Sequence, residues 1–252
     1  MVAKTDNREL TSGKMSIMSH LSELRGRLLK SVIAVVIGTG IAFVFAERIF
    51  EFLKAPTGGV DLVYIEMVEM LSTYFKVSLA AGFIVAMPYL VYQLFAFVSP
   101  ALTAKEKGYI YRILPAVMIM FLAGIAFAYY IALPPALNFL LTFGEGIAQP
   151  QIRIENYISI VTRLILAVGL VFETPVIIMF MSRLGLVTPQ WLAARRKIWI
   201  VLSFVIAAII TPTFDPLNQT IIAVPLIVLL ELSIWLAKLV RKKQPEPPSV
   251  EV

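Results

Sequence analysis

The sequence predicts an all-α integral membrane protein that crosses the bilayer six times. Of its 252 residues, 59% are hydrophobic and only 15% are charged, whereas roughly a quarter of the residues in soluble domains are charged. Apolar stretches of about 18 residues recur between short charged segments, and each is typical of a spanning helix. Helices are required because lipid cannot satisfy unpaired backbone polar groups.

Six spans follow from these apolar stretches. In order, they cover residues 28–46, 74–98, 111–133, 157–181, 198–210 and 220–237. The fifth is weak, because about 15 residues before Pro212 rise only about 22 Å, against about 30 Å of hydrocarbon. We therefore expect this helix to thin the bilayer or to cross it incompletely. We also expect the fifth and sixth helices to be distinctly shorter than the second, third and fourth.

The distribution of basic residues predicts the orientation. Seventeen of the 22 lysines and arginines flank alternate ends of the spans on one side, together with both termini. Only Arg48, Lys54 and Arg153 lie on the other side, while Lys76 and Arg163 lie inside spans. By the positive-inside rule the richer side is cytoplasmic, so both termini face the cytoplasm. This accounts for the net charge of +6 without a nucleic-acid partner.

Several function classes are excluded by composition. The chain has no cysteine, which excludes disulfides, iron–sulfur clusters and thiolate zinc sites. It has one histidine, too few for a zincin pair, and no phosphate-binding Gly-rich loop that ends in Lys-Ser or Lys-Thr. We expect no cofactor, no metal and no enzymatic activity. The polar first 30 residues lack the features of a removable signal peptide.

Residues outside the spans form three kinds of segment. A segment of about 27 residues joins the first two spans and is broken at Pro56 in Ala-Pro-Thr-Gly-Gly. Its part 47–54 is amphipathic, so we expect a helix that lies along the membrane surface or caps the bundle. The tail 243–252 is poor in apolar residues, which predicts disorder. Residues 1–242 are thus expected to form a single transmembrane domain.

Glu173 lies near the middle of the fourth span. A carboxylate there costs roughly 2.5 to 3.5 kcal/mol on insertion scales. Arg163 is about 15 Å along the helix and about 80° around it, so the two cannot pair. We expect Tyr92 and Gln93 to be the neighbours of Glu173. The carboxyl group is then either part of an interhelical hydrogen bond or a polar defect used by a translocating chain or a partner helix.

Other features keep a second class of function open. Glu231 and Gln219 add polar character to the sixth span and its approach, and Pro88, Pro175 and Pro225 interrupt the second, fourth and sixth spans. Each proline removes a backbone hydrogen bond and predicts a curved helix. Broken helices also occur at transporter substrate sites, so a small-solute transporter or channel is an alternative, although no internal repeat is visible. A membrane-embedded enzyme ranks third, because no catalytic constellation is present.

Two acidic residues lie on the predicted cytoplasmic face. Leu21, Leu24 and Leu28 form one stripe of a short amphipathic helix at about 16–27, which also carries Glu23. Spacing alone equally allows Glu23 to form an ordinary i,i+4 surface pair with Arg27. Glu106 stands among basic residues in an expected loop, 97–108. Both carboxylates could grip an arginine-bearing peptide through bidentate contacts.

The segment His20-Leu21-Ser22-Glu23-Leu24-Arg25-Gly26-Arg27 immediately precedes the first span and resembles the motif found at this place in the TatC family. Matches then follow in order at 88–93, at 97–102 with Glu106, at Phe-Glu-Thr-Pro in 172–175 and around 211–225. The resemblance covers about 19–242. Departures are Thr103 and Ala104, which stand in place of a tyrosine and a basic residue, and one extra residue before Asp215.

The resemblance implies the multispanning receptor of a prokaryotic inner-membrane translocase that exports folded proteins with twin-arginine signal peptides. It implies six helices in a concave, cupped bundle, with the proton motive force as energy source. Expected partners are TatA- and TatB-type single-span subunits around the fifth and sixth spans, further copies of the chain, and lipid. Signal-peptide contacts are expected from Glu23, Glu106, His20, Leu21, Arg25, Phe97 and Pro100; intramembrane or partner-helix contacts from Gln93, Glu173, Thr211, Asp215, Gln219 and Glu231; structural roles from Pro56, Pro88, Pro175 and Pro225.

Overall fold

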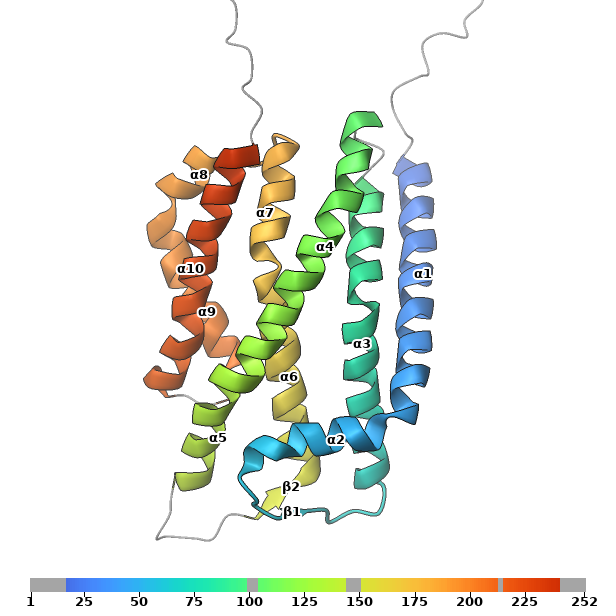
Figure 1. Ribbon diagram of the computed structural model, residues 1–252, viewed down its shortest axis with the longest axis vertical. Helices are drawn as coiled ribbons and strands as arrows, with labels where there is room; N and C mark the ends of the chain where they lie inside the picture. The colour runs from blue at the N-terminus through green and yellow to red at the C-terminus, as the bar shows by residue number, and fades with distance from the viewer. Residues whose placement is uncertain (1–16, 99–103, 144–150, 213–214, 241–252) are drawn as a thin grey trace, which may run out of the picture.

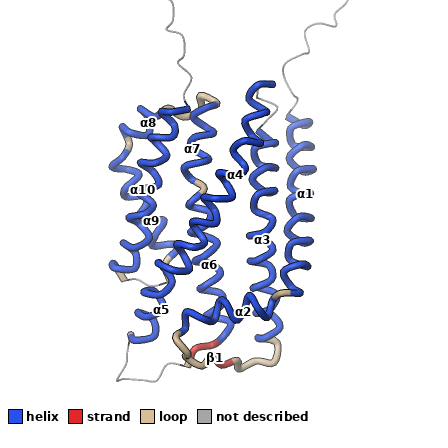
Figure 2. Tube along the Cα trace, in the orientation of Figure 1, coloured by secondary structure: helices blue, strands red, loops and turns tan. Residues whose placement is uncertain are grey.

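The computed structural model describes residues 17–98, 104–143, 151–212 and 215–240, and in the first turns of the helix that begins at 104 it describes the backbone alone. The described chain is a bundle of helices that run along one long axis (Figure 1). Its first and last described residues, Ile17 and Val240, lie at the same end, which we call the termini end. The opposite end, called the far end, carries the short connecting elements (Figure 2).

The elements follow one another along the chain as helices with two short strands. The helices are α1 (Ile17–Val44), α2 (Ala46–Lys54), η1 (Ala55–Thr57), α3 (Glu69–Val98), α4 (Ala104–Phe127), the π-helical turn η3 (Ala128–Ala132), α5 (Leu133–Thr142), α6 (Ile154–Phe172), α7 (Thr174–Arg183), α8 (Pro189–Ala194), α9 (Arg196–Ile210) and α10 (Pro216–Val240), and the strands are β1 (Leu62–Val63) and β2 (Ile152–Arg153). The predicted all-helical membrane class is confirmed.

Five helical stretches in the described part are long and apolar enough to cross a membrane. They lie within α1, α3, α4 to α5, α6 to α7, and α10. The prediction of a short fifth helix is confirmed, since α9 has 15 residues. The sixth helix is also shorter, but by only four to five residues: α10 has 25 residues, against stretches of 29 and 30 residues for the three spans that precede α9.

Helix ends differ from the predicted span ends because polar residues with good helix propensity extend helices past the hydrocarbon. The segment at 16–27 is no separate helix, since α1 runs from Ile17 to Val44 without a break. The expected loop at 97–108 is helical from Ala104, so Glu106 lies in the first turn of α4. Among the predicted interruptions, Pro175 follows a break at Glu173, whereas Pro88 and Pro225 lie inside continuous helices.

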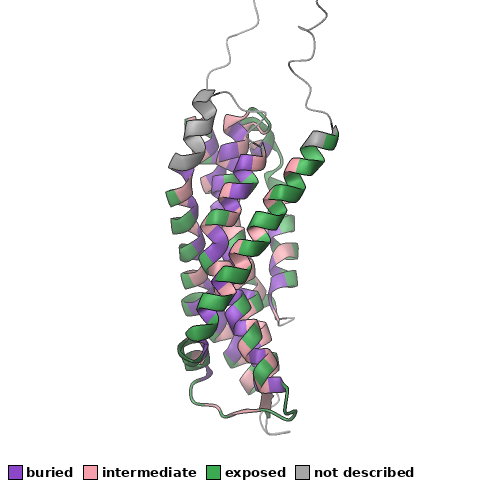
Figure 3. Ribbon diagram, turned by 90° about the vertical axis from the view of Figure 1, so that its right-hand side faces the viewer, coloured by how far each residue is buried: buried purple, intermediate pink, exposed green. Residues whose placement is uncertain are grey.

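Glycines bring helix pairs into close contact. A Cβ built on Gly82 of α3 would lie 2.3 Å from the backbone nitrogen of Thr39 in α1. One on Gly124 of α4 would lie 2.9 Å from the Cα of Gly169 in α6. Such small-residue contacts are typical of helix packing in membranes. Away from this contact α1 is largely uncovered, and the view onto that side shows mostly exposed residues along it (Figure 3).

The far end is closed by α2, which lies across the base of the bundle (Figure 1). Its amphipathic prediction is confirmed, because Phe50 and Leu53 are buried and Glu47 is exposed. Two tyrosine hydroxyls fasten its C-terminal half: Tyr129 donates to the Phe52 carbonyl and Tyr157 to the Leu53 carbonyl, each at 2.7 Å. Beyond α2, strands β1 and β2 pair in parallel, which the sequence did not predict.

Candidate functional site

At the termini end, the start of α1 packs against the end of α3. The imidazole of His20 stacks on the ring of Phe97 with centroids 4.3 Å apart and planes 19° apart. Both residues were predicted to belong to the site, and the stack brings them together. It fixes the first turns of α1 against α3, where the acidic residue of the motif follows one turn later.

Glu23 forms an ion pair within α1 and is linked through it to α3. Its Oε1 accepts hydrogen bonds from Arg27 Nε at 2.9 Å and from Arg27 Nη2 at 2.6 Å. Arg27 Nη1 also donates to Oε1 of Gln93 at 3.3 Å. The second carboxylate oxygen of Glu23 is buried and has no hydrogen-bond partner among the described residues. This corner can therefore hold a guanidinium group against a carboxylate, with one oxygen to spare.

The other predicted members of this site take different places. Leu21 and Arg25 are exposed on α1. Glu106 lies in the first turn of α4, which begins at the same end next to α3 (Figure 1). Its side chain and the whole of Pro100 lie outside the described residues. The proximity of the two carboxylates therefore stays a prediction.

A shallow groove of about 150 Å³ runs between α1 and α3 beside the ion pair. Four leucines and Phe97 form its apolar walls, and Arg27, Ser31 and Gln93 supply its polar part. The groove is therefore continuous with the Glu23 corner.

The buried carboxyl group of Glu173 lies at the break between α6 and α7. The residue is 2% exposed, and neither carboxylate oxygen has a hydrogen-bond partner in the described part of the chain. The expected absence of an ion pair with Arg163 is confirmed. An interhelical hydrogen bond, one of the two alternatives expected for this group, is therefore not formed among the described residues, and Gln93, one of its expected neighbours, accepts from Arg27 instead.

The turn between α9 and α10 collects three of the four remaining predicted polar residues. Thr211 Oγ1 donates to the Ala207 carbonyl at 2.8 Å, and Asp215 accepts from the backbone N–H of Asn218 at 3.1 Å, capping α10. Gln219 Nε2 donates to the Phe204 carbonyl at 2.9 Å and so ties α10 to α9.

Glu231 lies about 18 Å further along α10, because twelve residues separate it from Gln219. There it forms a two-point pair with Arg196, with distances of 2.6 and 2.8 Å. The polar residues predicted for the last two spans thus fall into two separate places, one near each end of α9.

The chain is similar to known proteins over most of its length. The family model described as Sec-independent protein translocase protein (TatC) matches residues 19–225. The chain belongs to the TatC family. The TatC protein of Aquifex aeolicus is 43% identical over 238 residues, covering 92% of this chain and 98% of that protein, and that of Carboxydothermus hydrogenoformans is 36% identical, covering 91% and 96%.

Two solved structures agree with the fold of this TatC family member. A crystal structure titled Twin Arginine Translocase Receptor TatC is 44% identical, covers 88% of this chain and 99% of that one, and has a TM-score of 0.75. A second, in DDM, is 43% identical, covers 86% and 99%, and has a TM-score of 0.77. The similarity spans whole chains, so it concerns the entire bundle.

A charged cluster at the far end was missed by the sequence analysis. The side chain of Glu69, at the start of α3, is fully buried. It accepts from Arg153 Nη2 at 3.1 Å and from the backbone N–H of Ile65 at 2.9 Å. Lys76 bonds to Glu155 close by. The only signal was that Arg153 is one of three basic residues on that side, because its partner is 84 residues away in the chain.

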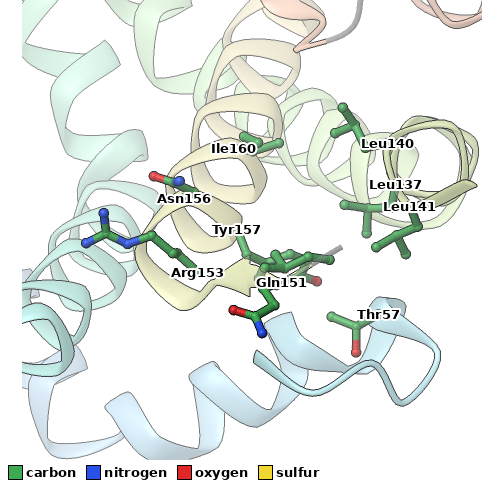
Figure 4. Close-up of a pocket in the computed structure, with 10 residues that line it drawn as sticks. Thr57, Leu137, Leu140, Leu141, Gln151, Arg153, Asn156, Tyr157 and Ile160 are labelled. Carbon is green, nitrogen blue, oxygen red and sulfur yellow. The ribbon is translucent and has the colours of Figure 1, made fainter. Parts of the chain in front are cut away.

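A cavity of about 240 Å³ in this TatC family member also lies at the far end. Figure 4 shows it between Tyr157 of α6 and the leucines of α5, with Thr57 below and the Arg153 guanidinium turned away from the leucines. It is mostly apolar and lies at the end opposite Glu23, so it is separate from the candidate site.

Proposed function

We propose that this chain is the receptor subunit of a Sec-independent translocase and that Glu23 and Glu106 bind the two arginines of a twin-arginine signal peptide. The names of its relatives and of the solved structures support a receptor of this kind. The observation that carries the site is that the Glu23 carboxylate already accepts a guanidinium group through two hydrogen bonds. A signal arginine presents the same group.

Arginine is selected over lysine because of its shape. The planar guanidinium can donate two parallel hydrogen bonds to one carboxylate, whereas an ammonium group is a compact point charge. Exposed ion pairs contribute about 0 to 1 kcal/mol each. Useful affinity therefore requires both acids and apolar contacts from the rest of the signal, for which the leucine-lined groove between α1 and α3 lies nearby.

The same proposal places the molecule in a prokaryotic inner membrane with its termini end in the cytoplasm. The basic residues around that end favour this orientation. TatA- and TatB-type single helices would pack around α9 and α10, where Thr211, Asp215 and Gln219 offer polar contacts, and copies of the chain would assemble with them. Energy would come from the proton motive force.

The first prediction tests the site by peptide binding in lipid nanodiscs. Glu23→Ala and Glu106→Ala should each weaken the binding of a fluorescent twin-arginine signal peptide by up to about fivefold, because each removes one ion pair. The parent should bind a Lys-Lys peptide more weakly than the Arg-Arg peptide.

Glu47→Ala is the matched control, because it removes an exposed glutamate at the far end. It should leave binding unchanged. If both Ala variants at the termini end bind the Arg-Arg peptide as tightly as the parent does, the proposed site is wrong.

A further inference from the structure

The ion pair between Arg27 and Glu23 uses only one of the two carboxylate oxygens of Glu23. Both contacting nitrogens of Arg27, Nε and Nη2, donate to the same oxygen of Glu23, at 2.9 and 2.6 Å. The other oxygen is buried and has no hydrogen-bond partner in the part of the chain that the structure describes. A guanidinium fork commonly engages a carboxylate through both oxygens. The internal pair therefore leaves part of the hydrogen-bonding capacity of Glu23 unused.

Arg27 also has a second acceptor on another helix. Its Nη1 lies 3.3 Å from Oε1 of Gln93, which is 5% exposed and held within α3. Arg27 and Gln93 both line the groove of about 150 Å³ between α1 and α3. When Arg27 leaves Glu23, its side chain can therefore move into this groove and keep its hydrogen bond to the neutral side chain of Gln93.

We propose that Arg27 is an internal competitor for the signal arginine, an inference that rests on the proposed function. In the resting receptor Arg27 neutralises Glu23, so an arriving cation meets no net negative charge there. When a signal binds, its arginine replaces Arg27 on Oε1 and gains the unused second oxygen. Arg27 withdraws into the groove and stays bonded to Gln93.

The competition lowers the affinity of the receptor for every cationic signal. An internal partner at a fixed distance must be displaced each time, and its cost is subtracted from the binding free energy. Weak binding suits a receptor that must release the signal after each cycle. Gln93 moderates the effect, because it stabilises the displaced position of Arg27.

The second prediction concerns Arg27 itself. Arg27→Gln removes the competing charge and keeps a polar side chain of similar length. It should bind the Arg-Arg peptide up to about fivefold more tightly than the parent, since this corresponds to the upper end of the range for a surface ion pair. The measurement is the equilibrium dissociation constant for the fluorescent peptide in nanodiscs. Arg27→Lys keeps the charge but loses the fork, so its affinity should fall between the two.

A double-mutant cycle tests the role of Gln93. Gln93→Met has similar volume and removes the acceptor that holds the displaced Arg27. In the parent background it should weaken peptide binding about threefold, because the internal pair becomes harder to break. In the Arg27→Gln background it should have no effect. Equal effects in both backgrounds would contradict the linkage between the two residues.

The outcomes separate this inference from the proposed function. If the parent does not distinguish the Arg-Arg peptide from a Lys-Lys peptide, and Glu23→Gln binds as the parent does, the function is wrong. If the parent is selective but Arg27→Gln binds equally or more weakly, the function stands and the competitor is refuted; Arg27 then only orients Glu23. Should Arg27→Gln fail to fold, the intermediate affinity expected of Arg27→Lys decides in its place.

Discussion

Two buried glutamates in the described part of the chain show how differently a carboxyl group is accommodated. Glu69 has no exposed side-chain surface and is held by Arg153 and by the Ile65 backbone N–H. Glu173 is 2% exposed and has no hydrogen-bond partner among the described residues. The paired carboxylate of Glu69 therefore stabilises the far end. The unpaired carboxyl group of Glu173 costs free energy of folding, and no described contact offsets that cost.

The third prediction compares the amide variants of these two residues. Glu69→Gln should lower the free energy of unfolding by about 1 to 3 kcal/mol, because a buried partner of Arg153 loses its charge. Glu173→Gln keeps the shape of the side chain and removes an unpaired buried carboxylate, so stability should be equal or higher. Thermal unfolding in one detergent measures both. A lower melting temperature for Glu173→Gln would show that its charge is structural.

The sequence predicted the side-chain contacts of some residues and not of others. The pair of Glu23 and Arg27 follows from its i,i+4 spacing on one helix. The link from Arg27 to Gln93 does not, because it depends on the rotation of α3 against α1. The same rotation made the expected contact of Gln93 with Glu173 wrong.

At the scale of elements, the contact of α1 with α3 positions the candidate site. Gly38 and Gly82 let the two backbones meet, and a Cβ on either would fall within 2.7 Å of backbone atoms in the other helix. Because α1 is otherwise largely uncovered, this contact and the His20 to Phe97 stack hold it in place. The position of Glu23 relative to α3 depends on both.

The fourth prediction uses two glycines that differ only in surroundings. Gly82→Ala should lower stability by about 1 to 3 kcal/mol, because the new Cβ overpacks the crossing. Gly40→Ala meets nothing within 4 Å and should raise stability by up to about 1 kcal/mol through helix propensity. Thermal unfolding gives the sign of each change. Gly82→Ala should also weaken signal-peptide binding, since it displaces α1; equal behaviour of the two variants would contradict a tight crossing.

Elements were predictable where apolar runs are long, and much less so at their ends. The apolar pattern identified the cores of the spans and the amphipathic α2. It missed where α4 begins, because Lys105 and Glu106 are good helix formers in a segment taken for a loop. The pairing of β1 with β2 joins residues about 90 positions apart, and strands of two residues carry no readable alternation.

At the scale of the whole molecule, the helices differ widely in length. Helix α3, with 30 residues, rises about 45 Å, whereas α9, with 15, rises about 22 Å. The turn between α9 and α10 accordingly stops short of the far end reached by α2, α5 and the start of α3 (Figure 1). The apolar runs predicted this short helix, whereas the cup that the family resemblance implies depends on contacts between distant helices that no local pattern encodes.

The fifth prediction is that the bilayer thins at the turn between α9 and α10. Asp215 lies at this turn, and its carboxylate, which accepts only from backbone N–H groups of α10, is costly to place in lipid, so water and headgroups should move toward it. The chain contains no cysteine, so single cysteines can be introduced cleanly. In proteoliposomes exposed on both sides to a membrane-impermeant maleimide, Leu217→Cys, 76% exposed at the turn, should react.

Val36→Cys is the matched control, because it is 64% exposed and lies near the middle of the span within α1. It should stay protected, since hydrocarbon surrounds the middle of a span. Longer acyl chains should slow the labelling of Leu217→Cys, because thinning a thicker bilayer costs fractions of a kcal/mol per Å of mismatch. If Leu217→Cys is protected as fully as Val36→Cys, the bilayer covers the turn, and partner helices must then bury α9 in place of a thinned membrane.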